Sequence, residues 1–111
     1  MTARVYALVS DLMDRSKISA TLAGVTFVRV ADACADADVV IVDLAKFGGQ
    51  VAAVRASVPT ARLVCFGPHV DEAAAADALA AGADLVWPRS RFFRDPAAAL
   101  VGLSGTDSRS K

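Results

Sequence analysis

A chain of 111 residues with 55% hydrophobic and 22% charged side chains has the composition of one folded domain, which excludes a disordered or fibrous protein. Twelve basic residues balance twelve acidic ones, so no electrostatic surface for nucleic acid or for an anionic membrane is indicated. The sequence has no apolar run of membrane-spanning length and no signal-peptide pattern at its start, and we therefore expect a cytoplasmic protein.

The first part of the chain alternates between strand-like and helix-like segments. An apolar run at Val5–Val9 predicts the first strand, and the helix that follows is expected to have Asp14 as its N-cap and Gly24 near its end. A second strand is expected at Val25–Val30. The next connection, residues 32–37, has room for only one or two helical turns, which is short for a crossover between parallel strands.

The segment Asp38–Leu44 is typical of a central parallel strand. Its nearly continuous β-branched run is bounded by polar residues, as expected for a strand that helices cover on both faces. Asp43 then comes at the carboxyl end of the strand, where open α/β sheets place their ligand-binding residues. The alternative is that Asp43 only caps or turns the chain after the strand.

The next segments repeat the alternation. A loop with two glycines at Lys46–Gly49 leads to a helix over Gln50–Ser57, which Pro59 ends. The fourth strand is expected at Arg62–Phe66 and breaks off at Gly67–His69. This order again predicts a strand, a helix and a strand.

A helix rich in alanine is predicted over Glu72–Ala81, with Asp71 as its cap and Gly82 at its C-terminal side. Leu79 is its only large apolar side chain. The helix must therefore pack very close to the sheet or present an alanine surface to something else.

The C-terminal part predicts one more strand and one more helix. A fifth strand is expected at Asp84–Trp87, and Asp95-Pro96 is a good helix start whose apolar segment ends by Leu103. We therefore expect a domain over residues 1–103 and a polar, disordered tail over residues 104–111.

Strands that alternate with helices predict an α/β fold in which right-handed crossovers build a parallel sheet with helices on both faces. For five strands we expect the doubly wound flavodoxin-like order 2-1-3-4-5, in three α/β/α layers, with shortened second and last helices. Its cleft lies at the carboxyl ends of strands one and three, where Asp11 and Asp43 are expected to meet. Two such carboxylates call for a hard cation, a shared proton or a neighbouring base, unless both are solvated loop residues.

Other reactive residues point to no further chemistry. Cys34 and Cys65 are far apart in sequence without metal-ligand spacing, and we expect buried free thiols. His69 has no visible nucleophile partner, and the sequence contains neither a G-x-G-x-x-G motif nor a P-loop. We therefore expect neither an autonomous enzyme nor one of these nucleotide sites.

Three segments are informative through their order and spacing: Asp38–Leu44, Leu63–Asp71 and Ala78–Asp84. Together they resemble the receiver domains of bacterial response regulators, also called CheY-like domains. The first looks like the strand that carries the phosphoacceptor aspartate, the second like the fourth strand and its loop, and the third like the alanine-glycine-alanine passage into the fifth strand. The resemblance covers residues 4–90 and implies a role in two-component or phosphorelay signalling.

The resemblance also implies a site, from which this sequence departs. A working receiver has an acidic pair after strand one for magnesium and an acceptor aspartate after strand three. Asp43 matches the acceptor, but the acidic pair has become Ser10-Asp11, with Asp14 as a further acidic candidate for the pocket. Asp11 and Asp43 would then form at most a weak magnesium site, and no other cofactor is expected.

The switch residues that the resemblance implies are also altered. The Ser or Thr after strand four matches Gly67, and the lysine-proline pair after strand five matches Arg89-Ser90. Phe47 replaces a proline that is usual after the acceptor strand. Without a metal ligand and a hydroxyl, much of the apparatus for phosphoryl transfer is lost, and an arginine fork does not reproduce a lysine point charge.

We therefore interpret the sequence as a stand-alone pseudo-receiver, a phosphorylation-independent protein-interaction module of a signalling pathway. Arg89 is expected to hold Asp43 or Asp11 in a standing salt bridge. Two alternatives stay open: a receiver that accepts phosphate on Asp43 with magnesium, and a small-molecule site in the same cleft.

The expected interface is a group of aromatic and arginine side chains around the end of the fifth strand: Trp87, Arg91, Phe92, Phe93 and Arg94. Aromatic and arginine residues are favoured in interface hot spots. We expect a homodimer or a heterologous protein partner to dock here, with Phe92 or Phe93 as anchor and Arg91 or Arg94 at the rim. The alternative is that the three aromatics plug the open side of the core.

Overall fold

The structure, a computed structural model, describes residues 3–67 and 72–104. These residues form a five-stranded, all-parallel sheet in the order β2-β1-β3-β4-β5. The strands are β1 (Val5–Leu8), β2 (Thr26–Phe27), β3 (Val39–Asp43), β4 (Arg62–Gly67) and β5 (Leu85–Pro88). The predicted flavodoxin-like order 2-1-3-4-5 is confirmed.

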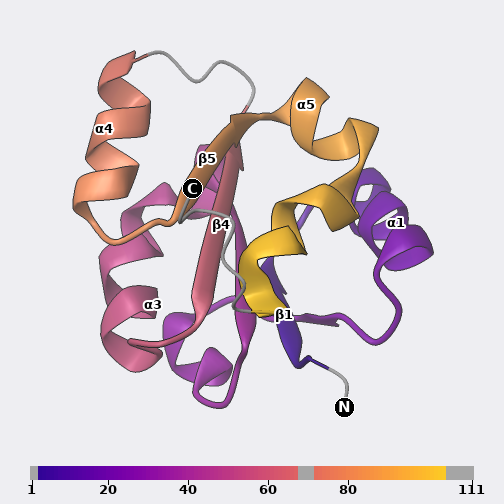
Figure 1. The fold of residues 1–111 in the computed structure, drawn as a ribbon, viewed down its shortest axis with the longest axis horizontal. Coiled ribbons are helices and arrows are strands. Elements are labelled where there is room, and N and C mark those ends of the chain that lie inside the picture. The colour runs from indigo at the N-terminus through magenta and orange to yellow at the C-terminus, as the bar shows by residue number, and fades with distance from the viewer. Residues whose placement is uncertain (1–2, 68–71, 105–111) are drawn as a thin grey trace.

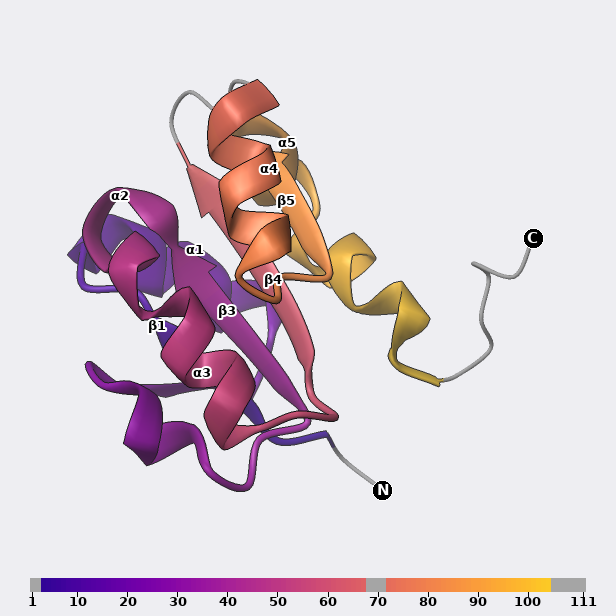
Figure 2. The same cartoon turned by 90° about the vertical axis from the view of Figure 1, so that its left-hand side faces the viewer.

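Helices cover both faces of the sheet (Figure 1). One face carries α1 (Leu12–Thr21), α5 (Arg89–Arg94) and the 3-10 segment η3 (Pro96–Ser104). The other carries α3 (Val51–Ser57) and α4 (Glu72–Ala80), and Figure 2 shows these two helices in front of the strands. Three short pieces complete the described part: η1 (Ala31–Cys34), α2 (Leu44–Phe47) and η2 (Gly48–Gln50).

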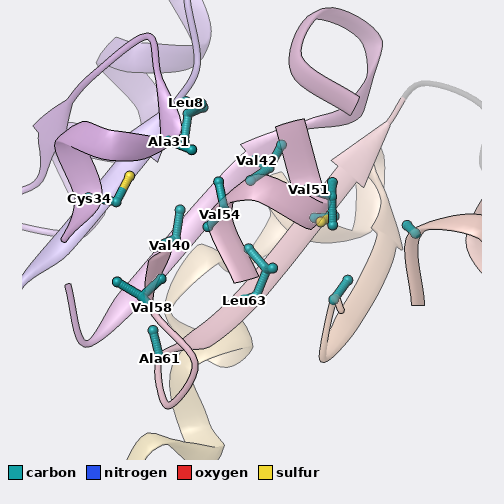
Figure 3. Close-up of a cluster of buried hydrophobic side chains, with 13 residues drawn as sticks. Leu8, Ala31, Cys34, Val40, Val42, Val51, Val54, Val58, Ala61 and Leu63 are labelled. Carbon is teal, nitrogen blue, oxygen red and sulfur yellow. The ribbon is translucent and has the colours of Figure 1, made fainter. Parts of the chain in front are cut away.

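The central strand β3 is buried along its whole length. Val40 and Val42 belong to the core beneath α3, which Figure 3 shows, whereas Val39 and Ile41 belong to the core beneath α1 and α5. Alternate side chains of a strand point to opposite faces, so a strand that is apolar throughout needs cover on both faces. Cys34 and Cys65 are buried free thiols, as predicted, and burial raises the pKa of Cys65 to about 12.

The second strand is shorter than the predicted Val25–Val30, because only Thr26–Phe27 pair with β1. Directly after β2 the Val28 amide still donates to the Ala7 carbonyl at 2.9 Å, and a side chain holds the backbone beyond it. Gln50 donates from Nε2 to the Arg29 carbonyl at 3.0 Å and accepts at Oε1 from the Ala31 amide at 2.9 Å. An apolar pattern cannot reveal that a side-chain amide ends a strand.

The first helix begins earlier than predicted. Asp11, not Asp14, is its N-cap, and its carboxylate accepts from the Asp14 amide at 3.0 Å. Asp14 therefore lies inside the first turn, and both Asp14 and Ile18 are buried. The two residues are one turn apart and share the buried face of the helix.

The C-terminal part also differs from the prediction. Residues Arg89–Arg94, for which no helix was predicted, form α5 directly after Pro88. The segment expected to begin at Asp95-Pro96 is the 3-10 segment η3. The expected cap Asp71, residue His69 and the tail from residue 105 lie outside the described residues.

Helix α4 contacts the sheet mainly through small side chains. Ala78 is its buried residue, whereas Leu79 is 49% exposed. The helix therefore leaves its one large apolar side chain half in solvent. No helix in residues 3–67 or 72–104 is long and apolar enough to cross a membrane.

Arg55 of α3 binds together the loops at the amino edge of β4 and β5. Its guanidinium donates to the Gly82 carbonyl at 2.9 Å, to Oδ2 of Asp84 at 2.8 Å, and to the carbonyls of residues 58, 59 and 61. Gly82 has a φ of +122°, and a Cβ there would lie 2.6 Å from Cγ of Arg55. Only a glycine therefore leaves room for the arginine stem.

Candidate functional site

Asp43 ends β3 at the carboxyl edge of the sheet and is only 4% exposed. Its Oδ1 accepts a hydrogen bond from the Ala45 amide at 3.0 Å, so the carboxylate caps α2. Burial raises the pKa of Asp43, the bond from Ala45 opposes this rise, and the negative charge of Asp14 adds to it. Asp43 therefore does cap the chain after the strand, and it does so as a buried carboxyl group with a raised pKa.

A bidentate ion pair lies beside Asp43. Arg89 donates from NH1 to Oδ2 of Asp14 at 2.7 Å and from NH2 to Oδ1 at 2.5 Å. Asp14 is 2% exposed, and Arg89 is the first residue of α5. Two parallel bonds between a guanidinium and a carboxylate are the strong form of this contact. The pair therefore fixes the start of α5 to the first turn of α1.

The guanidinium of Arg89 also packs on aromatic rings. Its central carbon lies 5.0 Å from the ring centre of Phe93 and 5.8 Å from that of Phe66. The hydrogen bonds to Asp14 raise the pKa of Arg89, and the charges of Asp43 and Asp11 contribute to this rise against the opposing effect of desolvation. Arg89 is thus a permanent positive charge between two aromatic rings and the acidic pocket.

The partner of Arg89 differs from the prediction. We expected Asp43 or Asp11, but the structure joins Arg89 to Asp14. The side chain of Asp11 is exposed and occupied in capping α1, whereas Asp14 faces the sheet one turn later. The spacing of Asp14 and Ile18 was the available signal, because a carboxylate on an apolar helix face needs a cation.

The expected interface residues separate into core and surface. Phe92 is fully buried and stacks on Phe66 at 4.8 Å between ring centres, so its expected role as an anchor is wrong. Phe93 is half-buried and meets Phe66 edge to face at 5.1 Å, with Lys17 over its ring. Trp87 is half-buried on the same core. The alternative that aromatics plug the core holds for Phe92.

Two of the arginines stay on the surface. Arg91 and Arg94 are exposed, and the guanidinium of Arg91 lies 4.3 Å from the ring centre of Trp87. A surface for a partner can therefore include Arg91, Arg94 and part of Trp87.

Similar solved structures exist, although no protein-family model and no curated protein matches the sequence. The phosphorylated cyanobacterial phytochrome response regulator RcpA has a TM-score of 0.79 at 12% identity, over 97% of this chain and 98% of that one. A LuxR-family two-component response regulator from Aurantimonas has a TM-score of 0.77 at 21% identity, over 95% and 87%. A Burkholderia pseudomallei response regulator with a phosphorylated aspartic acid, calcium ion and citrate has a TM-score of 0.77 at 15% identity, over 97% and 72%.

The fold is that of a response-regulator receiver domain. In this receiver fold Asp43 ends the central strand, and Gly67 ends β4 opposite Pro88 in the β4–β5 register. Gly67 is buried and brings no hydroxyl to the pocket. Phe47 packs against the core at the end of α2, and Ser90 is exposed in α5.

The carboxylates at this edge are partly engaged by other groups. Both oxygens of Asp14 bind Arg89, whereas Asp43 and Asp11 each use Oδ1 to cap α2 and α1. A weak magnesium site at Asp11 and Asp43 therefore stays a prediction, and Asp14 is not free to join it. Within residues 3–67 and 72–104, no group of three or more His, Cys, Asp or Glu side chains is arranged to hold a metal ion.

The first prediction concerns the ion pair. Arg89→Met should lower the free energy of unfolding by roughly 3 kcal/mol, because it leaves the buried carboxylate of Asp14 without a partner. Urea denaturation at pH 7 measures this loss, and most of it should be recovered when Asp14→Leu is added. Arg91→Met is the matched control and should cost less than about 1 kcal/mol. Equal losses in the two single variants would contradict the proposed importance of the pair.

The second prediction concerns the pH dependence that Asp43 causes. Because its folded-state pKa lies above the ordinary 3.8, the folded protein holds this proton more tightly, and stability falls as pH rises from 3.8 through the raised pKa. Asp43→Asn keeps an acceptor for the Ala45 amide and removes the titration. The stability of the Asn variant relative to wild type should therefore increase across this window and then level off. A difference that is constant from acid to neutral pH would refute the assignment.

Proposed function

We propose that this protein is a pseudo-receiver, a non-enzymatic interaction module of a signalling pathway that works without phosphate on Asp43. The observation that carries this proposal is the bidentate pair between Asp14 and Arg89 beside Asp43. The pair supplies the pocket with its own cation. The arrangement of α1, α5 and the end of β5 is then fixed without a signal from outside.

The altered pocket supports the same proposal. Phosphoryl transfer to an aspartate needs electrostatic stabilisation of the transferred oxygens. Gly67 offers no hydroxyl, Asp11 is occupied as a helix cap, and both oxygens of Asp14 are bound. The missing hydroxyl removes a direct contact to the phosphoryl group, and the engaged carboxylates leave fewer ligands for the metal ion that would neutralise its charge.

A phosphorylatable receiver is the second candidate function. Asp43 stands at the end of the central strand, and two of the similar structures, RcpA and the Burkholderia pseudomallei regulator, are phosphorylated. The two candidates differ in one measurable property, the stability of an acyl phosphate on Asp43.

The third prediction separates them. Incubation with magnesium and an acyl-phosphate donor, followed by intact mass measurement, should show no stoichiometric phosphoryl addition. The triple variant Ser10→Asp, Gly67→Thr and Arg89→Lys restores the acidic, hydroxyl and lysine positions and should gain the addition. A stoichiometric addition to the wild-type chain that Asp43→Asn abolishes would establish the second candidate instead.

The interaction surface that we propose lies over α4, β5 and α5. Helix α4 carries Glu72 and Asp77 with no basic residue, and half-exposed Leu79. Helix α5 carries exposed Arg91 and Arg94. In a two-fold pair of identical chains, the acidic helix of one copy can face the basic helix of the other. Charge complementarity therefore favours a homodimer.

The fourth prediction tests this dimer. Light scattering with size exclusion should show twice the mass of one chain, and Leu79→Ser should weaken dimerisation by roughly tenfold. Leu12→Ser is the matched control, because Leu12 is 76% exposed on α1 and lies outside the proposed surface. Both variants should keep the wild-type melting temperature within a few degrees. A wild-type monomer at every concentration, or equal weakening by the control, would remove the homodimer.

A further inference from the structure

A second polar pocket lies at the carboxyl edge, on the β2 side of β1. Asp43 lies at the end of β3 and hence on the other side of β1. The pocket has a volume of about 40 Å³ and is formed where β1 and β2 end beside α1. It is lined by Val9, Ser10, Arg15, Phe27, Val28 and Arg29.

Arg15 brings a fixed positive charge to this pocket. Its guanidinium carbon lies 4.7 Å from the ring centre of Phe27, so the planar group is held over an aromatic face. Among the described residues, ion pairs with carboxylates are made by Arg4, Arg55 and Arg89. The charge of Arg15 is therefore oriented by stacking and is not neutralised by a carboxylate in that part of the chain.

Arg29 is the second arginine that lines the pocket, and it follows β2. Its carbonyl is fixed by Gln50, and its exposed side chain has no ion-pair or hydrogen-bond partner among residues 3–67 and 72–104. Two arginines bring two positive charges to one small pocket, and an anion bound there would offset them.

The residue at position 10 determines the sign of the net charge of the pocket. In the receiver resemblance this position belongs to the acidic pair, and a carboxylate here would compensate the two arginines. The serine instead offers a neutral hydroxyl, which has no partner in the described part of the chain. Asp11, the adjacent acid, is exposed and accepts from the Asp14 amide. The departure from the receiver pattern thus makes the lining of this pocket basic, where a carboxylate at position 10 would have offset the arginines.

We infer that this pocket binds a small oxyanion of phosphate or sulfate size, held by Arg15 and Arg29 with the hydroxyl of Ser10 as a further hydrogen-bond donor. Guanidinium forks match the oxygens of such a group in geometry and charge. A volume of about 40 Å³ suits one oxyanion group and is too small for a larger molecule. When the oxyanion belongs to a larger molecule, the rest of that molecule lies in solvent. This site goes beyond the proposed function and does not depend on the state of Asp43.

The experiment is a titration with sodium phosphate followed by backbone amide NMR, against sodium chloride at equal ionic strength. The amides of Ser10, Arg15 and Arg29 should shift and saturate with phosphate but not with chloride. Sulfate and O-phosphoserine form two further arms, which distinguish a free ion from a phosphate monoester. A response that never saturates, or that chloride reproduces, overturns the inference.

Two variants locate the site. Arg15→Gln with Arg29→Gln should weaken phosphate binding by at least about tenfold. The control pair Arg4→Gln with Lys46→Gln removes the same charge from exposed residues that line neither this pocket nor the proposed dimer surface, and it should leave binding within about twofold. Ser10→Asp should abolish binding by repulsion while the amide spectrum keeps its dispersion. Phosphate binding that survives in both pocket variants, or that the control pair weakens equally, overturns the assignment.

Discussion

The buried carboxylate of Asp14 is the constraint on which the carboxyl edge of this fold depends. A charge that is 2% exposed is costly without a partner, and the fork of Arg89 binds both of its oxygens. Arg89 is the first residue of α5, so the pair joins the start of this helix to α1. The same guanidinium lies near the rings of Phe66 and Phe93, so the contact also contributes to their packing.

The same guanidinium sets the electrostatics of Asp43. Burial raises the pKa of Asp43, Asp14 adds to the rise, and Arg89 opposes it. Asp14, Asp43 and Asp11 thus all act on one permanent cation, so the side chains leave the pocket acidic while the pair between Asp14 and Arg89 holds the start of α5. Because this contact forms between side chains alone, we favour an interaction role without phosphorylation.

The fold could be predicted from the sequence because its strongest signals are local. The continuous β-branched run of β3 indicates by itself a strand that is covered on both faces, and the structure shows it buried throughout. The alternation of strands with helices then predicts the parallel topology. The site could be predicted only in part. The partner of Arg89 lies 75 residues away in sequence, and several acids were available to it. Phe92 shows the same difficulty, because aromatic residues beside arginines are equally typical of an interface and of a core.

The amino edge of the sheet has a different kind of constraint. Gly82 is free of a side chain because the stem of Arg55 occupies the space, and the guanidinium satisfies carbonyls that belong to two loops. Neither position can change by itself without a clash or an unsatisfied group. Residues 55 and 82 are consequently an epistatic pair. An alanine at position 82 avoids the clash only after position 55 has lost its long side chain, and the φ of +122° strains it even then, so evolutionary change at this edge costs stability whichever of the two residues is replaced first.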